Sequence, residues 1–155
     1  MKRTYQENKS LYESIMRDVA KIVKRHLNES DDSYIELEME GAKYINGALE
    51  FIRQHEDICD YFEKAGDIPF IKTRKVTSAA TDGKRIFFNP DFMDTLTDKQ
   101  QAFVIMHQIV HIVMNHLGSA GNMEENVRLD RKVNHFLEDK FPEFRGVTKE
   151  TNGIF

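Results

Sequence analysis

The chain has 155 residues, the length of a single domain with one sizeable core. Its net charge of −4, its scattered basic residues and its lack of tryptophan argue against nucleic-acid recognition. The one cysteine, Cys59, excludes an internal disulfide, and no run of about 18 apolar residues would span a membrane. Because the N-terminus lacks the apolar stretch of an export signal, we expect a cytoplasmic protein.

The N-terminal part, residues 1–65, is predicted to be helical. Apolar residues recur at three- and four-residue steps over about 5–27 and again over about 42–63, which indicates two amphipathic helices. Residues 34–40 fit a strand or a helix start equally well. Gly66 is expected to mark the end of the second helix.

The pattern changes after Gly66. An extended region begins near Ile68, and residues 76–81 and 84–89 flank Asp82-Gly83, a strong hairpin signal. Thr97 and Gln100 form a capping-box pattern that opens an almost wholly apolar helix, with Gly118 at its end. A last helix is predicted over about 124–140, before Pro142, followed by an irregular tail over 143–155.

The apolar helix contains His107-Gln108-Ile109-Val110-His111. Two histidines four residues apart lie on one side of a helix, as in the H-E-x-x-H motif that binds zinc in metalloproteases. The spacing alone is weak, because six histidines place such a pair in many chains by chance. However, imidazoles inside an apolar helix need polar partners, and a metal would satisfy both. The alternative is a pair of hydrogen-bonded core histidines.

A zinc site needs a third protein ligand and leaves a fourth position for water. Asp130 is the best candidate, because it lies in the middle of an apolar stripe of the last helix formed by Val127, Val133, Asn134 and Leu137. A buried ion pair, for example with Arg128 or Arg131, is the alternative role for Asp130. The other candidate ligands are His116, His135, Glu124 and Glu125.

Three blocks of this sequence resemble a family of predicted zinc metallopeptidase domains that usually precede a von Willebrand factor A-like domain. The blocks are Thr77–Phe92, His107–His111 with Asn115-His116, and Asn126–Asn134 around Asp130. The resemblance implies an α+β, zincin-like fold, with a small sheet packed against the helix that carries the ligands. It also implies that an edge strand of the sheet, 76–81 or 84–89, pairs with an extended peptide substrate.

The chain departs from this family in two respects. No von Willebrand factor A-like domain follows Phe155, so we expect a stand-alone domain over 1–155, with its zincin core at 66–142. Gln108 stands where the motif has its general-base glutamate, and an amide cannot take a proton from water at neutral pH. Either a deliberate replacement, which we favour, or a natural protein that binds without cutting explains Gln108.

We therefore predict a zinc-dependent peptidase scaffold with His107, His111 and Asp130 as Zn²⁺ ligands, acting on a protein or peptide substrate. Position 108 carries the catalytic base in an active form, and this chain is expected to be inactive. His116, His135 and Asn134 are candidates for stabilising the oxyanion, and His116 is predicted to be a catalytic residue. The alternatives are a non-catalytic zinc- or peptide-binding pseudo-peptidase, a repressor-cleaving H-E-x-x-H protease, and a helical interaction protein with core histidines.

Overall fold

The computed structural model describes residues 41–116 and 123–151. The predicted helix at 5–27 and the ambiguous segment 34–40 lie outside these residues. The described elements are α3 (Asn46–Gln54), α4 (Glu56–Glu63), β1 (Phe70–Lys72), β2 (Ala79–Thr81), β3 (Ile86–Phe88), α5 (Pro90–Met93), α6 (Asp98–Val113), α7 (Met123–Lys140), the 3-10 turn η2 (Pro142–Phe144) and α8 (Val147–Glu150). Helices with one small sheet make the fold α+β, as the sequence predicts.

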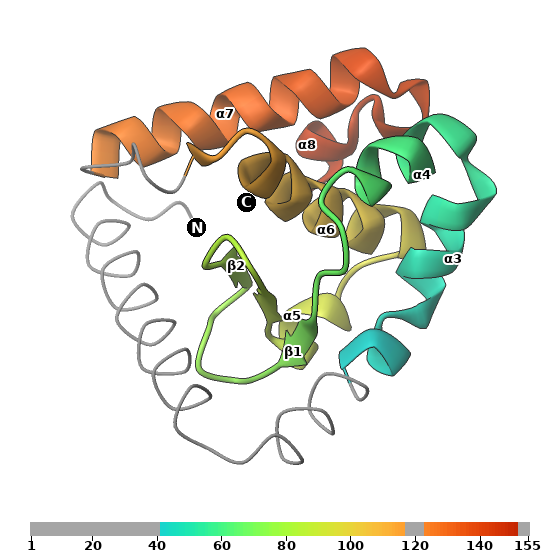
Figure 1. The fold of residues 1–155 in the computed structure, drawn as a ribbon, viewed down its shortest axis with the longest axis vertical. Coiled ribbons are helices and arrows are strands. Elements are labelled where there is room, and N and C mark those ends of the chain that lie inside the picture. The colour runs from blue at the N-terminus through green and yellow to red at the C-terminus, as the bar shows by residue number, and fades with distance from the viewer. Residues whose placement is uncertain (1–40, 117–122, 152–155) are drawn as a thin grey trace.

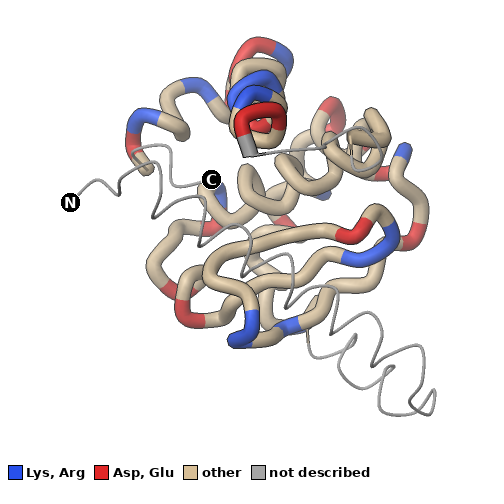
Figure 2. Tube along the Cα trace, turned by 90° about the vertical axis from the view of Figure 1, so that its left-hand side faces the viewer, with Lys and Arg blue, Asp and Glu red and all other residues tan. Residues whose placement is uncertain are grey.

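Helix α6 lies at the centre of the arrangement, between the small sheet and α7 (Figure 1). The predicted capping box is present: the Thr97 side chain accepts from the Gln100 backbone, and the Gln100 side chain accepts from the Thr97 backbone. Every residue of α6 from Ala102 to Val110 is buried. The helix carries no Lys, Arg, Asp or Glu after Lys99, so this stretch is tan in Figure 2, while both charge signs are interspersed on other elements. A helix buried on all sides explains its all-round apolar sequence.

The end predicted for this helix, at Gly118, is wrong. The helix ends at Val113, with Met114 as its C-cap, and Asn115 has a positive φ of 53°. A residue in the left-handed region just past a helix end reverses the chain, and asparagine tolerates this conformation better than most residues. Gly118 itself lies outside the described part of the chain.

The sheet has the strand order β1-β3-β2, with β1 parallel and β2 antiparallel to β3. The predicted hairpin at Asp82-Gly83 is confirmed, although its strands are shorter than predicted. Gly83 has a φ of 90°, and the Asp82 carboxylate accepts hydrogen bonds from the backbone N–H groups of Lys84 and Arg85. Because residues 82–85 form the turn, β2 ends before residue 82 and β3 begins after residue 85.

The prediction of one helix over 42–63 is wrong, because α3 and α4 are separated at His55. The backbone of His55 is extended, with φ −118° and ψ 101°, and its Nδ1 lies 2.7 Å from the Phe51 carbonyl oxygen. This side chain thus takes up a carbonyl at the end of α3. Both helices still bury one apolar face, through Ile52 and Ile58.

In its described part, up to Thr151, the tail after Pro142 is not irregular as predicted. It forms η2 and α8, and its side chains Phe144 and Val147 are fully buried. Both belong to the same hydrophobic cluster as Ile45 of the N-terminal part and Phe103 of α6. A single apolar core therefore joins the described residues on both sides of the segment 66–142. No helix within the described ranges is long and apolar enough to cross a bilayer.

A close approach between Gly41 and the strand β1 supplies a test of this packing. A Cβ atom at Gly41 would lie 2.6 Å from the Phe70 carbonyl carbon and would overlap its oxygen. We expect Gly41→Ala to lower the free energy of unfolding by about 1–3 kcal/mol, because backbone atoms cannot move aside cheaply. Urea unfolding measures this effect. The control is Gly47→Ala, whose Cβ would first meet the Asp98 carboxylate, the end of a side chain. Equal stability of the two variants would contradict the packing.

Candidate metal centre

His107 and His111 lie one turn apart on α6, and their rings face a common point. Their Nε2 atoms are 3.1 Å from one another. The side chain of His107 is 2 % exposed and that of His111 is 12 % exposed, so both imidazoles have little access to water. Two polar rings at this depth need partners, as expected from the apolar character of the helix.

Asp130 of α7 supplies the third group. Its Oδ1 lies 3.1 Å from Nε2 of His107 and 2.9 Å from Nε2 of His111. Asp130 reaches this point because α7 packs on α6 through an apolar stripe in which Val133 and Leu137 are buried. The structure therefore brings together the three residues that the sequence selects.

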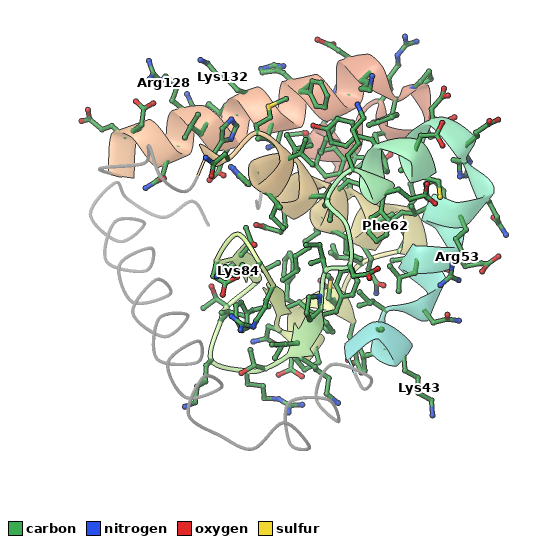
Figure 3. The ribbon with its side chains drawn as sticks, viewed as in Figure 1. Lys43, Arg53, Phe62, Lys84, Arg128 and Lys132 are labelled. Carbon is green, nitrogen blue, oxygen red and sulfur yellow. The ribbon has the colours of Figure 1, made fainter. Side chains whose placement is uncertain are left out.

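The alternative role of Asp130, an ion pair with a nearby arginine, does not fit the described contacts. Arg128 pairs with Glu125, three residues away on the same helix. Arg128 and Lys132 point away from the body of the protein (Figure 3). Asp130 faces the opposite way, toward the imidazoles.

Asn134, one turn after Asp130 on α7, fixes the protonation of His107. Its Oδ1 lies 2.7 Å from Nδ1 of His107. An amide oxygen only accepts hydrogen bonds, so this Nδ1 carries the proton and donates it. In neutral His107 the lone pair of Nε2 is therefore directed at Asp130 and His111. Sequence reasoning offered Asn134 for the oxyanion and missed this contact, although its four-residue spacing from Asp130 was a usable signal.

The electrostatics of the cluster favour the charged form of Asp130. Burial raises the pKa of this carboxyl group, but its contacts with His107 and His111 lower the pKa by more, so the net pKa is well below its usual value. Asp130 is thus a carboxylate at neutral pH. The group of two imidazoles and one carboxylate has a net charge of −1 when both imidazoles are neutral.

This donor set fits a divalent cation. In a tetrahedral site with metal–ligand bonds of about 2.0–2.1 Å, ligand atoms lie about 3.3 Å apart. The three separations here are 2.9, 3.1 and 3.1 Å, close to that edge length. A cation at the point where these three atoms converge would be bound by the imidazole lone pairs and by the carboxylate together. His107, His111 and Asp130 are accordingly a group that could hold a metal ion.

Gln108 lies beside this group and contacts the sheet. Its side chain is buried, and its Nε2 is 3.5 Å from the Ala79 carbonyl oxygen of β2, at the outer limit of a hydrogen bond. The residue directly after His107 on α6 therefore contacts β2.

The other candidate ligands lie apart from this group. His135 and Glu124 are exposed, and Glu125 pairs with Arg128. His116 does approach, but its Nδ1 lies 3.1 Å from Nδ1 of His111, the ring nitrogen that does not contact Asp130. Burial and the neighbouring charge of His111 lower the pKa of His116. The early end of α6 at Val113 makes this contact accessible to His116.

Comparison with known families agrees with the site. Residues 66–139 match the model of a family described as "Putative metallopeptidase domain". The matched segment runs from the end of α4 to the end of α7 and includes the sheet, both histidines and Asp130. This segment of the chain is therefore similar to that metallopeptidase-domain family. Searches of curated proteins and of solved structures found no match.

Removal of one ligand tests the metal centre. We expect Asp130→Asn to weaken the binding of Co²⁺ by more than the roughly 10- to 100-fold that loss of an outer hydrogen-bond partner costs, because an anionic ligand is lost. Isothermal titration with Co²⁺ measures the change. The control is Asp139→Asn, which removes the same charge from an exposed position of α7. Equal affinities of the two variants would exclude Asp130 from the site.

Proposed function

We propose that this chain is a zinc-binding domain of peptidase type, with a zincin-like arrangement in which His107, His111 and Asp130 hold Zn²⁺. The observation that carries the proposal is the convergence of two imidazole nitrogens and one carboxylate oxygen, within 3.1 Å of one another, inside the segment that matches a metallopeptidase family. Neither the spacing of two histidines nor the family match supports the assignment as strongly alone.

The choice of zinc rests on the donor types. Imidazole and carboxylate ligands suit zinc, and two histidines one turn apart with a third ligand from elsewhere are its usual catalytic set. A bound Zn²⁺ supplies Lewis acidity, which lowers the pKa of water and polarises a carbonyl group. The same three ligand types also occur with non-haem Fe(II), so iron is the competing outcome of a metal analysis.

The residue at position 108 decides whether such a site hydrolyses a bond. A glutamate there would accept a proton from water, whereas the Gln108 amide has no basic atom at neutral pH. The loss of a general base costs roughly 10²- to 10⁴-fold in rate. We infer that this chain keeps the metal-binding group and lacks hydrolytic activity.

The free edge of the sheet supports a peptide as the bound molecule. Ser78 accepts a hydrogen bond from the backbone of Asn89 on the β3 side, and alternate residues of an antiparallel strand point the opposite way. The backbone N–H and C=O groups of Ala79 and Thr81 therefore face away from β3. Within the described part of the chain β2 pairs on one side only, so these groups are placed to pair with an extended peptide. Gln108 lies at the same edge.

A second candidate is a non-catalytic module that binds zinc or a peptide without cleavage. Gln108 is the observation that favours it, because the amide both removes the base and donates toward the strand β2. The two candidates share the metal site and differ only in whether a glutamate at position 108 makes the chain a hydrolase.

Metal analysis together with Gln108→Glu separates these candidates. We expect purified protein to contain stoichiometric zinc by elemental analysis, and Gln108→Glu to cleave unfolded casein at least about 10²-fold faster than the unaltered chain. The control is the double variant Gln108→Glu with His107→Ala, which should be inactive. Bound zinc without cleavage by Gln108→Glu would favour the binding module, bound iron would reject zinc, and absence of metal would reject the site.

A proline on the free edge tests peptide pairing. Ala79→Pro removes an N–H that points away from β3, so the sheet should survive while one hydrogen bond to a peptide is lost. We expect this variant to bind an extended peptide, or cleave it in the Gln108→Glu background, about 5- to 10-fold less well, with unchanged Co²⁺ affinity. Ala79→Ser is the matched control, because it keeps the N–H. Identical peptide binding by the two variants would exclude this edge.

A further inference from the structure

We propose that His116 is a positioning residue for His111, which holds the ring of His111 in place through a hydrogen bond to Nδ1, both when His111 is protonated on Nε2 and when it is protonated on Nδ1 for metal binding. This inference rests on the proposed metal site and adds a residue to it. It starts from the distance of 3.1 Å between the Nδ1 atoms of the two rings.

The hydrogen-bond partners of His111 require different protonation with and without a metal. In the metal-free site, Nε2 of His111 is 2.9 Å from the carboxylate of Asp130, so Nε2 carries the proton of a neutral ring and donates it. Its Nδ1 is then an acceptor, and Nδ1 of His116 donates to it. To bind a metal through Nε2, His111 must carry its proton on Nδ1 instead, and His116 must accept.

An imidazole can serve in both states because it is a donor at one nitrogen and an acceptor at the other. On metal binding, Nε2 of His111 releases its proton to solvent, the proton on Nδ1 of His116 passes to Nδ1 of His111, and Nε2 of His116 takes up a proton from solvent. Each ring therefore carries one proton in both states. The partner of His107 differs in this respect, because the Asn134 oxygen accepts in either state and keeps the proton of His107 on Nδ1. The proton of His107 thus stays on Nδ1, which suits metal binding through Nε2. For His111, the nitrogen that carries the proton depends on His116.

The backbone turn after α6 brings His116 to this position. On a continuous helix, His116 would lie five residues, or about 140°, round from His111 and one to two turns along it. The helix instead ends at Val113, and Asn115, with its φ of 53°, reverses the chain. Asn115 is the one non-glycine residue with a positive φ in the described ranges. The left-handed conformation of Asn115 therefore brings the ring of His116 into contact with the ring of His111.

Co²⁺ titration of four variants tests the proposal, with affinity and the visible spectrum of bound Co²⁺ as readouts. We expect His116→Phe to weaken binding roughly 10- to 100-fold, and His116→Asn, whose amide can donate or accept in either orientation, to stay within about 3-fold of the unaltered chain. Asn115→Gly should also bind normally, because glycine adopts a positive φ freely, whereas Asn115→Val should bind about as poorly as His116→Phe.

Two controls separate positioning from a general effect on folding. His135→Phe makes the same change at an exposed position of α7 and should bind Co²⁺ normally. In a His111→Ala background, His116→Phe should cause no further loss, because the ring through which it acts is gone. Thermal unfolding in the presence of a chelator checks that each variant is folded.

The outcomes distinguish this proposal from the metal site beneath it. If the unaltered chain binds no Co²⁺, the proposed metal site is wrong and the role of His116 falls with it. If the unaltered chain binds Co²⁺ and His116→Phe binds equally well, or if His116→Phe loses as much again in the His111→Ala background, the metal site stands and the positioning role is overturned.

Discussion

The contact on which the rest of the site depends is the approach of the Asp130 carboxylate to the two imidazole Nε2 atoms across the packing of α6 against α7. Histidine side chains in a buried helix need polar partners, and the carboxylate of Asp130, whose side chain is 42 % exposed, supplies one to both rings. The distances between the three groups suit a shared cation. Removal of α7 from this arrangement would take this partner away from two imidazoles among apolar neighbours.

The surrounding fold restricts the movement of α6 and α7 at this contact and leaves the outer edge of β2 unpaired. The residues Ala102–Val110 are enclosed by the sheet, α3 and α7, so the axis of α6 has little freedom to shift. On α7 the apolar residues Val133 and Leu137 point inward, while Arg128 and Lys132 extend outward, which fixes the rotation of α7 about its axis (Figure 3). Gln108 then meets β2 at its unpaired edge, so the metal-binding group and the edge strand adjoin the same residue.

Local signals in the sequence predicted most elements of the described fold. The capping box at Thr97, the turn at Asp82-Gly83 and the long apolar helix are confirmed, because each depends on residues close together in the chain. The errors arose where a side chain or a distant partner overrides the local pattern. The side chain of His55 contacts a backbone carbonyl group of α3 and interrupts the helix within a continuous apolar repeat. The tail is helical around Phe144 and Val147 because both side chains pack in the hydrophobic core. A pattern over a few neighbouring residues does not predict either contact.

For the site itself, the sequence alone determined that His107 and His111 share one side of a helix and that Gln108 lacks a basic atom. Both follow from the 3.6-residue helical repeat and from side-chain chemistry. It also singled out Asp130, because a carboxylate in an apolar stripe needs a partner. Only the tertiary structure decided that this partner is the pair of histidines, that Asn134 and His116 lie behind the two rings, and that His135 and both glutamates lie elsewhere. The reason is that contacts between helices depend on how two apolar faces pack and on one left-handed residue after α6, neither of which local spacing specifies.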